Sequence, residues 1–243
     1  LNLTSTNYVD ILNYRSKNLG SIQGADYTLS AHFMPYSVPD GKKKNDQQYA
    51  ILMKPGYHLG LSFGHDRRFA MSHQFVGGSK TNLVAAFSSG KFDENEWHHV
   101  VGTVNRSEGT VNLFVDGKAA GSAEFPANSR GYVSSKLWRI GVASPMGKSH
   151  RWYAEGAVDQ VRIYNRALEV EEINELYVIE QPAPFEKEML VYYPFNAGDI
   201  KNVKESLPSK GSDGGFDLAD SIKNPLLKPE PTEDRFGEPN AAY

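Results

Sequence analysis

Regular alternation of apolar and polar residues is the feature that most constrains the fold of this chain. In the segments YTLSAHF (27–33) and YHLGLSF (57–63), every second residue is apolar. Because successive side chains of a strand point to opposite faces, this pattern predicts strands with one buried face. Further strands are expected at 50–54, 69–76, 82–87, 97–104, 110–115, 137–142 and 157–164.

Short turn segments separate these expected strands. Asp116-Gly117 predicts a two-residue hairpin, because such a turn needs positive φ at both positions and Asp and Gly tolerate it. One helix is expected, over 169–177, where Val170, Ile173 and Leu176 stand at helical spacing. Many short strands and almost no helix predict an all-β fold, a two-sheet antiparallel sandwich.

Composition excludes several classes of protein. Of the 243 residues 40% are hydrophobic and the net charge is −3, which is typical of an ordered globular chain and not of a nucleic-acid-binding protein. The absence of cysteine excludes disulfides and thiolate metal sites. No apolar run approaches the ~18 residues of a membrane span. The chain begins at Leu1 and not at Met, as expected if a leader was removed or the chain trimmed.

The sequence also predicts how the chain is divided. Residues 1–180 hold the expected strands and helix, and 181–188 belong to a proline-containing stretch typical of a linker. Residues 189–243 begin with one apolar strand, MLVYYPF, and continue rich in Gly, Ser, Asp and Pro. About 55 residues with one clear strand are too few to bury a core alone, so this tail is expected to pack on a sandwich.

Three motifs in the second half of the 1–180 region carry a resemblance to a known family. From Glu96 the chain reads EWHHVVGTVNRSEGTVNLFVDGKAAG, then LWRIGVA, then AEGAVDQVRIYNRALEVEEINELY. Their order and spacing resemble bacterial LamG modules, the laminin-G-like branch of the concanavalin A-like lectin/glucanase superfamily. The resemblance is specific over 96–177 and looser over 1–87. It implies a concanavalin A-like jelly-roll sandwich with one short C-terminal helix.

The same resemblance interprets the tail. LVYYPFNAGD (190–199) and EDRFGEPNAAY (233–243) resemble the first two strands of a LamG module, here at the far end of the chain. Two explanations stay open: a slice of a tandem array, or a permuted or swapped unit whose tail completes a sandwich. In both cases 189–195 and 235–243 are expected to pair with a sandwich, in the same chain or in a neighbouring copy. Pairing in trans would give strand-swapped self-association.

The superfamily includes glycoside hydrolases, so a catalytic alternative must be considered. Its glucanases carry their two carboxylates in an ExDxE pattern on one strand, and this chain lacks that pattern. The adjacent His98 and His99 face opposite sides of a strand and cannot jointly hold one ion. The HDRR segment (65–68) falls in a hairpin turn and is assigned no chemistry. The sequence therefore predicts a protein that is not an enzyme.

Calcium is the one cofactor that the resemblance implies, because related sandwiches hold it with loop oxygens. The candidate ligands are Asp159, Asp199 and Asp213. Gln160 stands where the family often has a second acid, and the tail loop lacks the compact DxSGNGN run. A structural alternative stays open, in which Asp159 accepts hydrogen bonds from neighbouring backbone or from Arg162.

Aromatic side chains beside polar ones indicate a carbohydrate site, since a sugar stacks its CH groups on a ring and bonds its hydroxyls to polar groups. Trp97 and Trp138 lie in motif strands and are expected in the core. The candidate ligand-binding residues are Tyr57, Arg68, Asn82, Tyr132, His150, Arg151 and Trp152.

The predicted function is that of a non-catalytic module that recognises a glycan, in a secreted, periplasmic or cell-surface bacterial protein. A structural or adhesive repeat that binds a surface protein is the first alternative, and a glycoside hydrolase is the disfavoured one. Neither nucleic acid nor a membrane span is expected.

Overall fold

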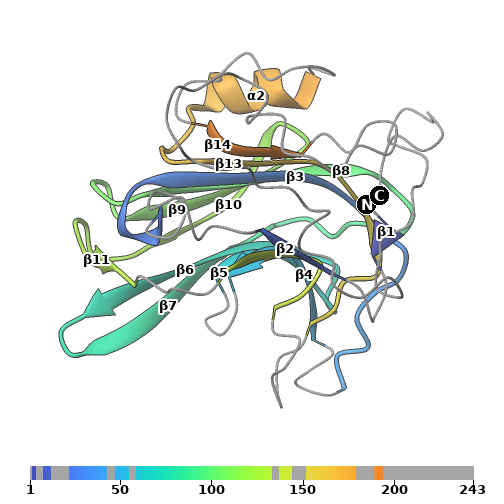
Figure 1. Ribbon diagram of the computed structural model, residues 1–243, viewed down its shortest axis with the longest axis horizontal. Coiled ribbons are helices and arrows are strands. Elements are labelled where there is room, and N and C mark those ends of the chain that lie inside the picture. The colour runs from blue at the N-terminus through green and yellow to red at the C-terminus, as the bar shows by residue number, and fades with distance from the viewer. Residues whose placement is uncertain are drawn as a thin grey trace.

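In the described part of the chain, two antiparallel sheets pack face to face and one α-helix lies outside the first sheet (Figure 1). The computed structural model describes residues 2–3, 8–11, 22–42, 47–54, 59–132, 137–143, 152–178 and 189–193. The all-β sandwich predicted from the alternation is confirmed. The expected strands are found with their ends displaced by no more than a few residues.

Each sheet contains seven of the strands in the described residues. The first contains β1 (Asn2–Leu3), β3 (Tyr27–Pro35), β8 (His98–Asn105), β9 (Thr110–Val115), β10 (Lys118–Glu124), β13 (Gly156–Tyr164) and β14 (Met189–Tyr193). The second contains β2 (Val9–Ile11), β4 (Gln48–Lys54), β5 (Leu59–Gly64), β6 (Phe69–Gly77), β7 (Lys80–Phe87), β11 (Arg130–Gly131) and β12 (Trp138–Ile140). The orders are β1-β13-β3-β8-β9-β10, with β14 also on β13, and β11-β6-β5-β4-β12-β2, with β7 also on β6. A 3₁₀ turn, η1 (Ile22–Gly24), precedes β3.

The inner faces of the two sheets form the main core. Phe33 of β3 packs near Phe63 of β5, with 6.4 Å between ring centroids, and Phe63 packs near Phe69 of β6 at 5.0 Å. Trp138 is fully buried, as predicted. The expectation that Trp97 lies in the core is wrong, because β8 begins only at His98 and leaves Trp97 half-buried in the segment before it.

The predicted hairpin at Asp116-Gly117 is confirmed by φ angles of 52° and 73°. The Asp116 carboxylate accepts a hydrogen bond from the backbone N–H of His99 and lies 2.9 Å from Nδ1 of His98. His98 packs against Phe92 on the core side, whereas His99 lies on the other face of the sheet, 2.9 Å from the Ser30 hydroxyl. The two histidines therefore face opposite ways, as expected for neighbours on a strand.

Helix α2 (Val170–Val178) covers the outer face of the first sheet (Figure 1). Its buried residues, Ile173 and Leu176, belong to a second apolar cluster with Val101 of β8 and Phe114 of β9. The predicted helix is thus confirmed, and its apolar spacing is explained by this contact.

The tail strand β14 joins the first sheet of its own chain. It pairs antiparallel with β13, Val161 opposite Tyr193, on the side of β13 away from β3. Strand β1 pairs with β13 farther along the strand, Asn2 opposite Ala157. The start of the tail, 189–193, therefore packs on the sandwich in cis, while 194–195 and 235–243 lie outside the described residues.

A buried histidine makes the core sensitive to acid. Nδ1 of His73 lies 3.0 Å from the Tyr27 hydroxyl, and its ring packs against Phe125. Burial, and secondly the charge of Arg106, lowers the pKa of His73 from 6.5 to about 4. Below about pH 6.5 His73 is therefore protonated in the unfolded chain, whereas in the folded chain it stays neutral down to about pH 4. The contribution of the neutral His73 to the free energy of unfolding is lost as the pH falls through this range.

We expect the free energy of unfolding to drop by about 2 kcal/mol through this residue between pH 7.5 and pH 5.0. Urea denaturation at the two pH values measures the drop. A His73→Gln variant, which has no titrating ring at this position, should show a drop smaller by that amount. Equal drops in the two proteins would contradict the assignment.

Candidate functional site

Small side chains form a row across the outer face of the second sheet. Ala50 of β4 lies opposite Ser62 of β5, Ser62 opposite Ala70 of β6, and Ala70 opposite Phe87 of β7. Because side chains alternate along each strand, these residues face outward while their neighbours fill the core. These small side chains leave space above the sheet, and the Phe87 ring of β7 borders this space.

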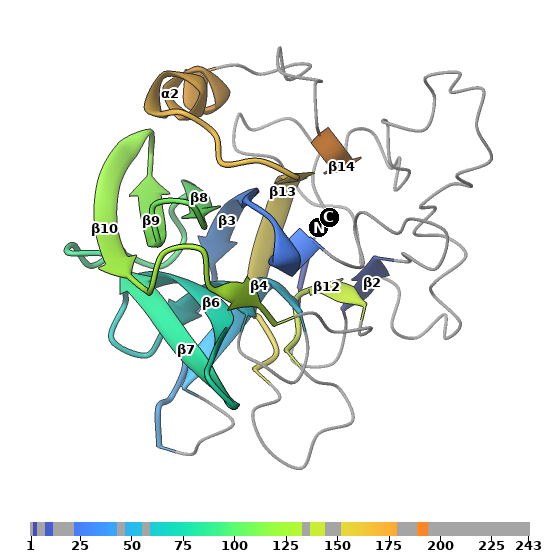
Figure 2. The ribbon, with the colours of Figure 1, turned by 90° about the vertical axis from the view of Figure 1, so that its left-hand side faces the viewer.

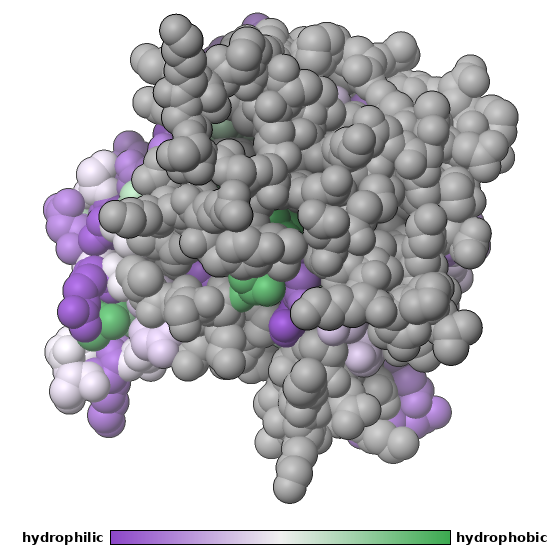
Figure 3. Space-filling model, viewed as in Figure 1, coloured by the Kyte–Doolittle hydropathy of each residue, from purple (hydrophilic) through white to green (hydrophobic). Residues whose placement is uncertain are grey.

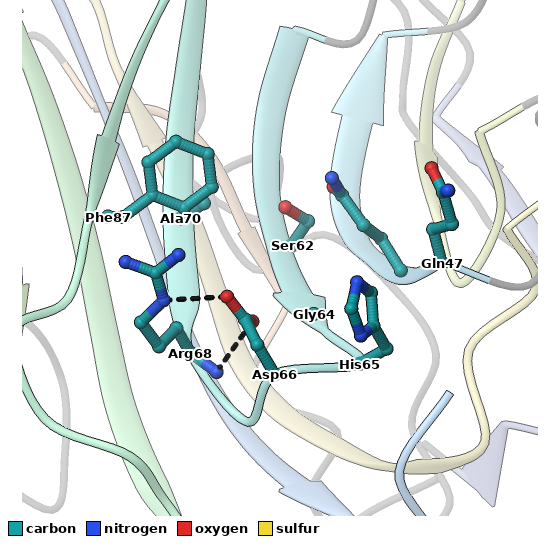
Figure 4. A pocket seen from close by; sticks show the side chains of 9 residues that line it. Gln47, Ser62, Gly64, His65, Asp66, Arg68, Ala70 and Phe87 are labelled. Atoms are coloured by element: carbon teal, nitrogen blue, oxygen red, sulfur yellow. Dashed lines mark hydrogen bonds and ion pairs between the residues drawn. The ribbon is translucent and has the colours of Figure 1, made fainter. Parts of the chain in front are cut away.

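A hollow of about 160 Å³ opens at this place (Figure 4). It is lined by Gln47, Gln48, Ser62, Gly64, His65, Asp66, Arg68, Ala70 and Phe87. In Figure 4, Phe87, Arg68 and Asp66 stand on one side, His65 and Gln47 on the other. The volume is below the roughly 300–1,000 Å³ of pockets that enclose drug-sized ligands, so the hollow suits one small ring.

The turn between β5 and β6 builds one rim of the hollow. The N–H of Gly64 donates to the carbonyl of Arg68 at 2.8 Å, and Arg67 takes a positive φ of 64°. The Arg67 guanidinium reaches away to Asp93 and Glu94, both at 2.8 Å. Arg68, the next residue, lines the hollow.

Arg68 and Asp66 form an ion pair on this rim. Nε of Arg68 lies 2.7 Å from the Asp66 carboxylate, and its guanidinium lies 5.0 Å from the centre of the Phe87 ring. Within the described part of the chain, no group accepts a hydrogen bond from the terminal amino groups of Arg68. Partial burial raises the pKa of Asp66, but the hydrogen bonds and charge of Arg68 outweigh it and hold that pKa below its ordinary value. Asp66 is therefore ionised at neutral pH.

Ser62 lies at the floor of the hollow with an unsatisfied hydroxyl. The residue is 1% exposed, and its Oγ has no hydrogen-bond partner among the described residues. Buried polar groups are nearly always hydrogen-bonded, and leaving one unpaired costs about 1–3 kcal/mol. A ligand hydroxyl entering the hollow would satisfy it.

The structure separates the residues predicted to bind ligand. Arg68 lines the hollow. Asn82 lies toward the far end of the β6–β7 hairpin, where its amide donates to the Lys80 carbonyl, and the described residues there are mostly hydrophilic (Figure 3). Tyr132 follows β11 and bonds through its backbone to Gln74, so neither residue reaches the hollow.

Trp152 differs from the exposed platform that was expected. It is 5% exposed and packs on Ala50 and Met53 of β4, at the end of the row away from Phe87. Its ring closes that side of the sheet and offers no open face. Tyr57, His150 and Arg151 lie outside the described residues.

The calcium candidates are only partly described. Asp159 of β13 is buried, and its carboxylate accepts a hydrogen bond from the backbone N–H of Gln160 at 2.8 Å. Arg162 donates to the backbone carbonyl and side-chain oxygen of Gln160 and not to Asp159. Ca²⁺ takes 6–8 oxygen ligands, and among the described residues no three His, Cys, Asp or Glu side chains could hold an ion. Asp199 and Asp213 lie outside these residues.

The hollow also lacks the carboxylate pair of a glycosidase. Its lining includes one acid, Asp66, and that acid is held by Arg68. Hydrolysis with retention needs two carboxyl groups about 5–5.5 Å apart. The described lining therefore offers one carboxyl group where such a hydrolysis needs two.

A family model of the concanavalin A-like lectin/glucanase superfamily, of the laminin-G type, matches residues 3–174. This protein belongs to that superfamily. The resemblance inferred from the three motifs is thereby confirmed, and it extends over the first half of the chain as well. A comparison with curated protein sequences finds no match.

Solved structures of the superfamily fold are similar to this chain. A candidate carbohydrate-binding protein from Bacteroides ovatus has a TM-score of 0.60 at 15% identity, over 83% of this chain and 55% of that one. The chain thus spans about half the length of that protein. The CBM40 of the Ruminococcus gnavus IT-sialidase, solved with α2,3-sialyllactose, has a TM-score of 0.53 at 10% identity, over 73% and 95%. At such identities these likenesses show the fold alone.

In the described part of the chain, no helix has the length and apolar character needed to cross a membrane.

Proposed function

We propose that this protein is a non-catalytic carbohydrate-binding module and that the hollow on the outer face of the second sheet binds the sugar. The observation that carries the proposal is the buried Ser62 hydroxyl, which has no partner in the described chain and lies at the floor of a polar hollow. The half-exposed Phe87 ring, 45% exposed, supplies an apolar surface for sugar CH groups.

Two further features support a sugar over an apolar ligand. The lining is rich in hydrogen-bonding side chains, namely Gln47, Gln48, His65, Asp66 and Arg68. The concanavalin A-like fold is also that of a named carbohydrate-binding module. A module of this kind meets glycans outside the cytoplasm, so we place it in a secreted, periplasmic or cell-surface bacterial protein.

A glycan array followed by isothermal titration calorimetry tests the proposal with a variant that fills the hollow. Ala70→Leu puts a larger side chain on the hollow floor, and Ala85→Leu makes the same change on β7, on the same face but outside the lining. We expect the wild type to bind at least one glycan, Ala70→Leu to lose affinity about 10-fold or more, and Ala85→Leu to bind normally. No binding to any glycan, or undiminished binding by Ala70→Leu, would refute the site.

Self-association through the tail is a second candidate property. Strand β14 lies at the edge of the first sheet, beside β13, and buries Met189 and Tyr192. The same edge in a second copy offers the same backbone groups, so an exchanged strand would make the same pairing. A concentration-independent monomer in sedimentation velocity would rule this out.

Calcium binding through Asp159 with Asp199 and Asp213 stays a prediction of the family resemblance.

A further inference from the structure

We propose that the hollow selects a neutral sugar through two adjacent hydroxyl groups and discriminates against carboxylated sugars. This inference rests on the proposed function and names the class of glycan for that site. The Asp66–Arg68 ion pair and its surroundings carry it.

The charges of the lining balance. Arg68 is its one cation and Asp66 its one carboxylate, so the formal charge of the lining is zero with His65 counted as neutral. The two charges are 2.7 Å apart, and Asp66 already neutralises Arg68. A sugar carboxylate would have to lose its hydration and approach Asp66 without an unpaired cation to offset that cost.

The ion pair offers a hydrogen-bond donor and an acceptor next to each other. Only Nε and the backbone N–H of Arg68 are used by Asp66, which leaves the terminal amino groups of the guanidinium as donors. An ionised carboxylate has about four acceptor sites, so Asp66 keeps room for another hydrogen bond. A donor and an acceptor held side by side match adjacent sugar hydroxyls, one of which accepts from Arg68 while the other donates to Asp66.

The remaining lining groups lie around this ion pair. The Arg68 guanidinium lies over the Phe87 ring, so the bonded hydroxyls would sit beside an apolar surface that receives the CH groups. Ala70 and Ser62 form the floor below, and the Ser62 hydroxyl can bond a third sugar oxygen. All three contacts use neutral hydroxyl or CH groups of the ligand.

The test compares neutral and acidic oligosaccharides on the same protein. The neutral set consists of gluco-, manno-, xylo- and galacto-oligosaccharides, and the acidic set of sialyllactose and oligogalacturonate. Calorimetry at low and high salt is expected to give a neutral binder whose Kd changes less than about 2-fold with salt. The acidic sugars should bind about 10-fold more weakly or not at all.

An Asp66→Asn variant changes the charge of the lining to +1 and replaces one of the two charged acceptor oxygens by an amide NH2 donor. We expect it to bind the neutral sugar about 10-fold more weakly and acidic sugars more tightly than the wild type does, with the gain lost at high salt. Asp93→Asn is the matched control, because Asp93 also pairs with an arginine, Arg67, but lies outside the hollow. It should change neither affinity.

The outcomes separate the inference from the proposed function. If an acidic sugar binds the wild type more tightly than every neutral one, carbohydrate binding stands and the selection of neutral sugars is wrong. If Asp66→Asn leaves both affinities unchanged, as expected for Asp93→Asn, the Asp66–Arg68 ion pair does not determine which sugars bind. If no sugar of either set binds, the result contradicts the proposed carbohydrate-binding function itself. The wild-type comparison decides between the classes even if Asp66→Asn does not fold.

Discussion

Replacement of Arg68 by alanine is expected to weaken carbohydrate binding at least about 10-fold. A hydrogen bond to a charged group contributes about 1.5–3 kcal/mol, and each 1.4 kcal/mol is a factor of 10 in Kd. The variant loses the guanidinium that lines the hollow and leaves Asp66 without its partner. Titration calorimetry with the best glycan of the array measures the loss.

Arg67→Ala is the control for this prediction, because it removes the same side chain from the neighbouring position. The Arg67 guanidinium pairs with Asp93 and Glu94 on the surface, where ion pairs contribute only about 0–1 kcal/mol. We expect its glycan affinity to stay within about 2-fold of the wild type. Equal losses in the two variants would mean that the hairpin turn as a whole matters, and not the side chain that lines the hollow.

Replacement of Trp138 by alanine is expected to lower the free energy of unfolding by about 3–5 kcal/mol. The side chain is fully buried in β12, a strand of three residues that joins β2 to β4. Its ring packs edge-on to Tyr27, with centroids 6.5 Å apart, and lies 5.7 Å from the Lys54 ammonium. The loss would therefore combine a cavity in the core with a lost contact to a buried cation. Urea denaturation followed by circular dichroism measures it.

Trp97→Ala provides the comparison, since Trp97 has the same size but is only half-buried before β8. We expect it to cost no more than about half as much as Trp138→Ala. A Trp138→Phe variant should fall between the two, because it keeps a ring beside Tyr27. If Trp97→Ala and Trp138→Ala destabilise the protein equally, burial between the sheets is not what makes Trp138 important.

The sandwich could be predicted because its signals are local. Period-two alternation identifies strands such as 27–33, and the Asp116-Gly117 turn identifies a hairpin from two residues. The helix at 169–177 also follows from spacing within one segment. The prediction for Trp97 is wrong because a motif gives the neighbourhood of a strand but not the residue at which it begins, and β8 begins at His98.

The site could not be predicted because it depends on register between strands. Ala86 and Phe87 are both apolar, and alternation does not say which one faces the core. Pairing with β6 decides it: Ala86 lies opposite the buried Met71, and Phe87 lies opposite Ala70 on the outer face. The row of small residues likewise exists only once three separate strands are aligned.

Two other residues show the same limit. His65 and Asp66 were visible in the HDRR turn, but a turn does not reveal that Gln47 lies beside it, which is set by the hydrogen bond from His65 N–H to the Gln47 carbonyl. The sequence around Trp152 predicts an exposed ring that could stack on a sugar. In the structure, a long-range contact packs Trp152 against Ala50. Both contacts join segments far apart in the chain.

Titration of isotopically labelled protein with the best neutral oligosaccharide, followed by the amide chemical shifts, tests the central claim most directly. Binding in the hollow predicts that the largest changes fall on Ser62, Asp66, Arg68, Ala70 and Phe87, with none at α2 or on the outer face of the first sheet. Changes that concentrate around α2, or at Asn82 and Tyr132, would place the carbohydrate elsewhere and contradict the assignment.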